Sequence, residues 1–130
     1  MIIAIDFDGT IVEHKFPKIG QTHPFAFETL KALEEKGHLL ILWTYRSGEL
    51  LDKAVQFCRQ NGIEFYAVNK NFPEEQFNTS MSRKILADIY IDDRNFNGFP
   101  GWGIIGQQLL NNENNKPSIQ KRKKIFSRNK

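Results

Sequence analysis

The chain has 130 residues, of which 40% are hydrophobic and 25% are charged, a balance typical of one water-soluble domain with a single core. No apolar run approaches the roughly 18 residues that a membrane span needs, so we expect no membrane segment. The net charge of +3 hides an asymmetry, because seven of the 18 basic residues lie between Lys116 and Lys130 whereas all 15 acidic residues lie between Asp6 and Glu113.

Two features favour a cytoplasmic protein. The N-terminal segment leads directly into an apolar strand, with no basic region and no small-residue cleavage site, so we expect no signal peptide. The single cysteine, Cys58, cannot form a disulfide within the chain.

The first expected element is a buried strand over residues 1–6, because an apolar run leads into Asp6 and is closed by Gly9. Asp6 and Asp8 lie two residues apart and can face one site, while Phe7 between them points away. Carboxylates this close repel each other unless a cation lies between them, and Mg²⁺ prefers such oxygen ligands. Asp-Gly is also a common turn dipeptide, so a plain turn is the alternative.

The following segments alternate between helical and strand patterns. We expect an irregular loop over 9–23, a helix over 24–36, a strand over 39–43 that ends at Thr44, a helix over 49–60 and a short strand over 65–68. Thr22 and Ser47 are suitable N-caps, and Gly37 and Gly62 are suitable residues just after the two helices.

The remaining segments are shorter. A polar loop is expected over 69–82, then a strand over 89–91 that ends at Asp92 and Asp93, a final strand over 102–105 and one helical turn over 107–110. Strands that alternate with helices predict an α/β fold with a parallel sheet and helices on both faces. The carboxyl ends of the first, second and fourth strands then meet at one edge.

Four segments in this order resemble the motifs of the haloacid dehalogenase (HAD) superfamily of aspartate-nucleophile phosphatases. The stretch IIAIDFDGT resembles the first motif, and the apolar strand that ends at Thr44 resembles the second. Lys84, followed by ILADIYIDDR, is similar to the third and fourth. The resemblance implies a HAD-like Rossmannoid three-layer fold with a mainly parallel central sheet, formed by a catalytic domain over residues 1–110.

The resemblance also implies the roles of the acidic residues. Asp6 would be the nucleophile that forms an aspartyl phosphate, which agrees with its place at the end of a rigid strand. Asp8 would be the general acid and base, and its main-chain carbonyl a metal ligand. Asp6 and Asp93 would hold Mg²⁺ with their carboxylates, and Asp92 would support them.

Positively charged and hydroxyl side chains are expected to hold the phosphate. The resemblance gives this role to Thr44 and Lys84, and Lys70 is a rival for the lysine position. Arg46 and Arg94 closely follow two of the motifs and are candidates for binding other charges of the substrate. Both arginines are also plausible surface residues.

The spacing of the motifs leaves no room for a cap domain. Only 33 residues separate Thr10 from Thr44, and the segment from Thr44 to Lys84 holds one helix, one strand and a loop. A small capless member has an open site, which suits a large phosphorylated substrate. Cover by a neighbouring subunit in a homo-oligomer is the alternative.

Residues 111–130 are polar and basic and are expected to form a flexible tail. Lys121 to Lys124 would attract nucleic acid in a salt-dependent way, and a merely solubilising tail is the alternative. The sequence thus predicts a Mg²⁺-dependent phosphatase that acts through an aspartyl phosphate. The alternatives are a nucleic-acid end-processing phosphatase and a non-catalytic module that binds phosphate or metal.

Overall fold

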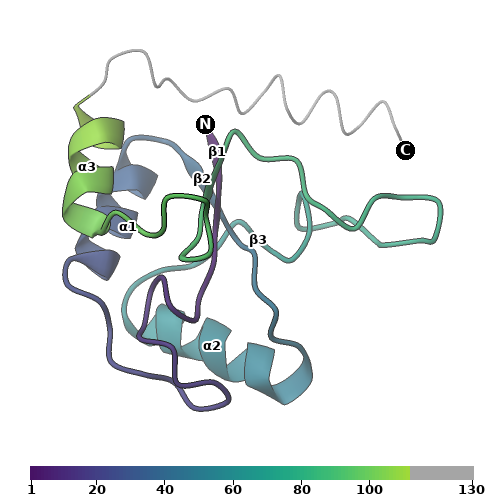
Figure 1. Ribbon diagram of the computed structural model, residues 1–130. Helices are drawn as coiled ribbons and strands as arrows, with labels where there is room; N and C mark the ends of the chain where they lie inside the picture. Colours follow the sequence, from purple (N-terminus) through teal and green to yellow (C-terminus); the bar gives the residue numbers. More distant parts are fainter. Residues whose placement is uncertain (112–130) are drawn as a thin grey trace.

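A computed structural model describes residues 1–111 of the chain (Figure 1). At its centre is a sheet in which every pair of neighbouring strands is parallel, in the order β3-β2-β1-β4. The strands are β1 (Ile2–Ile5), β2 (Leu39–Leu42), β3 (Ala67–Val68) and β4 (Ile89–Ile91). β1 and β2 lie in the middle, and their residues are almost all buried, which explains their continuous apolar runs.

Three helices complete the described part of the chain: α1 (Ala26–Glu35), α2 (Gly48–Gln60) and α3 (Trp102–Leu110). The expected glycines follow the caps of the first two helices, and Gly37 and Gly62 have φ angles of 89° and 88°, which a residue with a Cβ rarely adopts. Ser47 is the N-cap of α2, as expected. The N-cap of α1 is Phe25, in the left-handed region, instead of Thr22.

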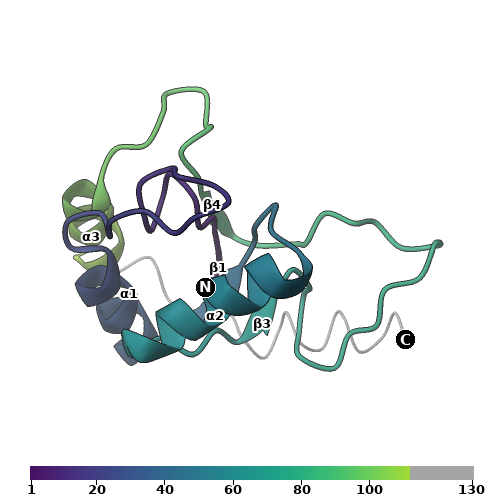
Figure 2. The same ribbon diagram turned by 90° about the horizontal axis from the view of Figure 1, so that it is seen from below.

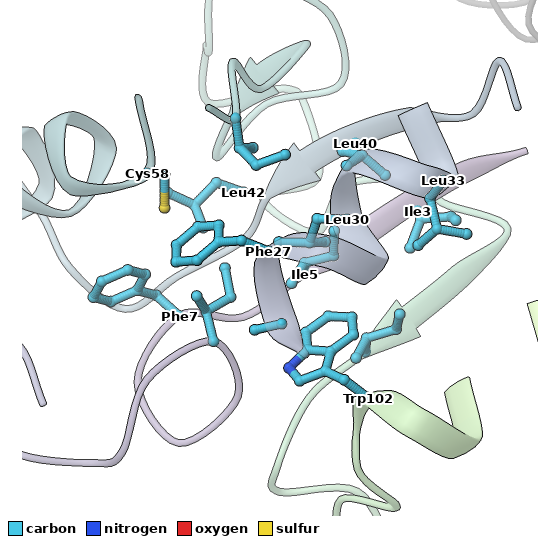
Figure 3. Close-up of a cluster of buried hydrophobic side chains, with 14 of the residues drawn as sticks. Ile3, Ile5, Phe7, Phe27, Leu30, Leu33, Leu40, Leu42, Cys58 and Trp102 are labelled. Atoms are coloured by element: carbon cyan, nitrogen blue, oxygen red, sulfur yellow. The ribbon is translucent and has the colours of Figure 1, made fainter. Parts of the chain in front are cut away.

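The three helices pack on the same face of the sheet (Figures 1 and 2). Ile3, Ile5 and Leu40 point to this face and share one core cluster with Leu30 of α1 and Trp102 of α3 (Figure 3). The connections through α1 and α2 both step from the centre toward β3, so right-handed crossovers place both helices on one side.

The opposite face of the sheet is covered by the irregular segment between β3 and β4. This connection returns from β3 past β2 and β1 to β4, so the same handedness rule puts it on the other side of the sheet. Ile85 from this segment packs against Ile2, Ala4 and Ile41 in a second core cluster. The third layer is therefore this segment, and not a helix as the sequence pattern had indicated.

The prediction of a final strand over 102–105 is wrong, because these residues form the first half of α3. Trp102 turns into the core, and its indole Nε1 donates a hydrogen bond to the carbonyl oxygen of Thr10 at 2.8 Å. As a helix, this segment buries Trp102 and Ile105 on one side. It does not extend the sheet, whose edge on this side is β4.

The α/β Rossmann-like fold is confirmed, and residues 1–111 contain no inserted cap domain. None of the helices in this part of the chain has the length and apolarity that crossing a membrane requires. The basic tail was predicted over residues 111–130; Asn111 is the C-cap of α3, and the rest of the predicted tail lies outside the described residues.

Candidate active site

Polar side chains lie together at the carboxyl end of β1, where neighbouring strands on the two sides are connected in opposite directions along the sheet. From β1 the chain moves to β2 on one side, while β4 pairs with β1 on the other side. In parallel sheets such a switch point opens a crevice beyond the carboxyl ends of the strands. Asp6 directly follows β1, and Asp92 and Asp93 directly follow β4. The main-chain N–H of Asp6 donates to the carbonyl oxygen of Ile91 at 3.0 Å, which keeps the two strand ends side by side.

The carboxylates of Asp6, Asp92 and Asp93 form a cluster that could hold a metal ion, because one oxygen of each lies within 4.8 Å of the others. Burial raises the pKa of Asp6 from 3.8 to about 7, and the neighbouring charges of Asp92 and Asp93 add to the rise. The Oδ1 atom of Asp93 is buried and has no hydrogen-bond partner. A buried carboxylate oxygen without a partner is costly, and a bound cation would satisfy it.

Gly9 is required beneath this cluster for two reasons. Its φ angle is 85°, which disfavours any residue with a side chain. A Cβ atom at this position would also lie 2.1 Å from Oδ2 of Asp93. The glycine of the Asp-Gly pair therefore allows the loop after β1 to pass close under the carboxylate from β4.

Asp8 forms an ion pair with Arg46, which follows β2. Nε of Arg46 donates to Oδ2 of Asp8, and Nη2 donates to Oδ1, both at 2.8 Å. Nη2 also donates to the carbonyl oxygen of Lys18. The side chain of Arg46 is 0% exposed, so this arginine is neither a surface residue nor positioned to bind substrate, the two alternatives that the sequence had left open. It positions Asp8 instead.

Thr44 lies at the end of β2 in a turn that two neighbours hold in place. Its main-chain N–H donates to Oδ1 of Asn69 at 2.8 Å, and its hydroxyl oxygen accepts a hydrogen bond from the main-chain N–H of Arg46 at 3.2 Å. Asn69 itself follows β3 and has a left-handed φ of 54°, a conformation that asparagine tolerates well. The hydroxyl of Thr44, which accepts one bond, can still donate its proton to a ligand.

A cavity of about 560 Å³ connects these groups. Its buried and half-buried polar lining residues are Asp6, Asp8, Thr44 and Asp92, whereas Asp93 is not among the residues that line it. The half-buried Trp43 lines it too, and its exposed lining residues, which we call the rim, are His14, Phe16, Tyr45 and Arg94. The structure thus brings most of the predicted site residues together, with Arg94 as a candidate cation at the rim.

Lys84 and Lys70 do not line this cavity. Lys84 lines a separate surface hollow together with Asn71 and Glu75, and its Nζ lies 5.1 Å from the centre of the Tyr90 ring. Lys70 lines another hollow beside α2. Both lie in or next to the irregular segment after β3, whose path the sequence does not specify. The position of Lys84 therefore gives no support to its expected role at the phosphate.

The sequence did not lead us to predict the aromatic residues of the rim or Asn69. Asn69 could have been predicted, since it is a polar residue that directly follows a short apolar strand, as Thr44 and Asp92 also do. Phe16 could not, because it lies in a loop of mixed composition whose path over the site depends on the fold.

Comparison with known proteins gives one informative match. Neither a family model nor a curated protein matches the chain. A solved structure of a conserved protein coded by a locus of Bacteroides thetaiotaomicron is 57% identical in sequence, with a TM-score of 0.81. The match covers 85% of this chain and 90% of that one. The chain belongs to the family of this conserved Bacteroides protein.

Proposed function

We propose that the chain is a Mg²⁺-dependent phosphomonoesterase of the HAD type, which acts through an aspartyl phosphate on Asp6. The observation that carries the proposal is the cluster of Asp6, Asp92 and Asp93 at the switch point of the sheet. Three carboxylates so close together carry charge that only a cation or bound protons can compensate. The order of motifs that resembles the HAD superfamily supports the same reading.

The residues of the cluster fit a hard divalent cation. Asp6 and Asp93 would hold it, because Oδ1 of Asp93 is buried and without a partner. Oδ1 of Asp92 instead accepts a hydrogen bond from the main-chain N–H of Arg94 at 2.8 Å, which favours a supporting role. When bound, Mg²⁺ supplies positive charge that neutralises a phosphate oxygen and the carboxylates around it.

The proposed reaction has two steps. A carboxylate oxygen of Asp6 attacks phosphorus, the bond from phosphorus to the ester oxygen breaks, and the leaving alcohol takes a proton from Asp8. Water then attacks the aspartyl phosphate and passes a proton to Asp8. Inorganic phosphate leaves, and the carboxylate of Asp6 is restored.

Arg46 and Thr44 support these steps. Each oxygen of Asp8 accepts one hydrogen bond from Arg46 and keeps a lone pair for a proton, so the pair fixes the direction of the carboxyl group without blocking it. The hydroxyl of Thr44 would donate to a phosphate oxygen from a turn that Asn69 holds. Preorganised donors of this kind are the usual source of rate enhancement in phosphoryl transfer.

Steady turnover of an aryl phosphate with Mg²⁺ tests the proposal. We expect many turnovers per chain for the wild type and none for Asp6→Asn, while Asp52→Asn on the exposed face of α2 should retain full activity as the matched control. Metal-dependent binding of phosphate without turnover would instead establish a non-catalytic module. Release of at most one product molecule per chain would indicate a phospho-acceptor domain.

A further inference from the structure

Two aromatic rings at the mouth of the cavity lack the cover that such side chains normally have. Tyr45 is 90% exposed and Phe16 is 38% exposed, and both line the cavity that Asp6 and Asp92 of the acidic cluster also line. Their rings meet edge to face, with centroids 5.9 Å apart and an angle of 69° between the planes. Clustered exposed aromatic rings are a common mark of a binding surface.

The two rings are held in place from below. The guanidinium of Arg46 lies 5.3 Å from the centre of the Phe16 ring, and Arg46 is fixed by Asp8. Tyr45 lies between Thr44 and Arg46, and its backbone neighbours are held by Asn69. The backbone that carries Tyr45 and the ring of Phe16 are therefore held in place, and a ligand that covers them need not order a loose segment.

The geometry points to a substrate class that deepens the proposed function and rests on it. We infer that the cavity takes a phosphomonoester whose alcohol carries a flat aromatic ring, as in a nucleoside monophosphate. The phosphate would lie at the acidic cluster, and the ring would stack on Tyr45 with the edge of Phe16 against it. A cavity of about 560 Å³ is within the range that holds a ligand of this size.

Different residues would bind the phosphate and the aromatic ring of such a substrate. Asp6, Asp8, Thr44 and Asp92 supply polar groups to the cavity, whereas Tyr45 and Phe16 offer a ring face and a ring edge at the rim. A flat aromatic group can stack on one ring and contact the other, which an aliphatic alcohol cannot do to the same extent. Stacking of a base on an aromatic side chain changes affinity by roughly five- to 150-fold.

The test compares adenosine 5′-monophosphate with glycerol phosphate in the presence of Mg²⁺. We expect the ratio of their kcat/KM values to favour the nucleotide in the wild type and to fall about tenfold in Tyr45→Ala, equivalent to about 1.4 kcal/mol. Tyr45→Phe should keep the ratio, and so should Phe77→Ala, which removes a partly exposed ring outside the cavity. Equal ratios in wild type and Tyr45→Ala would overturn the inference.

A binding measurement separates this inference from the proposed function. If neither ester is hydrolysed, the proposed function fails, and calorimetry with Mg²⁺ then compares adenosine 5′-monophosphate with inorganic phosphate. Weaker nucleotide binding by Tyr45→Ala, relative to phosphate, supports the aromatic platform on its own. An unchanged ratio of the two affinities, or no nucleotide binding by the wild type, refutes it.

Discussion

Replacing Asp6 with asparagine should stabilise the metal-free protein at alkaline pH, although it removes the proposed nucleophile. Burial and the charges of Asp92 and Asp93 raise the pKa of Asp6 from 3.8 to about 7. The folded state therefore keeps a proton that the unfolded state releases between about pH 4 and 7. The free energy of unfolding falls as the pH rises through this window, and asparagine removes that loss.

The magnitude follows from the size of the shift. About three pKa units correspond to at most roughly 4 kcal/mol, since each unit is worth about 1.4 kcal/mol. Asp6 is only partly buried, so screening by water weakens the effect. We expect Asp6→Asn to gain about 1–2 kcal/mol over the wild type at pH 8 and close to nothing at pH 4.5.

Urea unfolding in the presence of a chelator, at both pH values, measures this difference. Asp52→Asn serves as the control for the loss of one negative charge on the surface of α2. His38, whose pKa is lowered by burial and by the nearby charge of the N-terminus, titrates in all variants and cancels in the comparison. A variant that is no more stable than the wild type at pH 8, or a gain of equal size at both pH values, would refute the reasoning. Addition of Mg²⁺ should stabilise the wild type and not Asp6→Asn.

Four further substitutions probe the site. Gly9→Ala places a Cβ against Asp93 in a left-handed conformation and should cost about 1–3 kcal/mol and abolish stabilisation by Mg²⁺, measured by urea unfolding; full stability would contradict the close approach. Arg46→Met leaves Asp8 buried without its partner and should cost about 3–5 kcal/mol in the same assay; a loss below about 1 kcal/mol would mean that the pair is solvated. Asp93→Asn should weaken Mg²⁺ binding in calorimetry more than Asp92→Asn does, and equal losses would leave the assignment of Asp93 as the ligand unsupported.

The sequence predicts those parts of the fold in which one structure is clearly favoured. The runs at β1, β2 and β4 are short, apolar and closed by polar residues, which leaves little alternative to buried parallel strands. Residues 102–105 offer no such signal, because a short apolar run next to glycines fits a strand and a helix equally well. Their helical state is decided by packing, since Trp102 fits the core beside α1.

The candidate site also has residues whose position the sequence predicts and others whose position it does not. The strand ends bring Asp6, Thr44, Asp92 and Asp93 to one edge because their positions depend only on the strands and their direction. Lys84 lies in a segment without regular structure, so its spacing from β4 did not determine where its side chain lies. The burial of Arg46 was also beyond the sequence, because an arginine near a strand end can bind a substrate, face solvent or pair with a buried acid.

The hydrogen bond from Trp102 to Thr10 joins two segments that lie 92 residues apart. The loop that carries Asp8 and Gly9 is thus braced by a helix that is among the last described elements to be synthesised. During translation the first strand emerges long before this brace exists. A nascent chain that ends between Asp93 and Gly101 has every acidic side chain of the cluster and still lacks the contact that steadies its loop, so we expect metal affinity to appear late and abruptly as the chain grows.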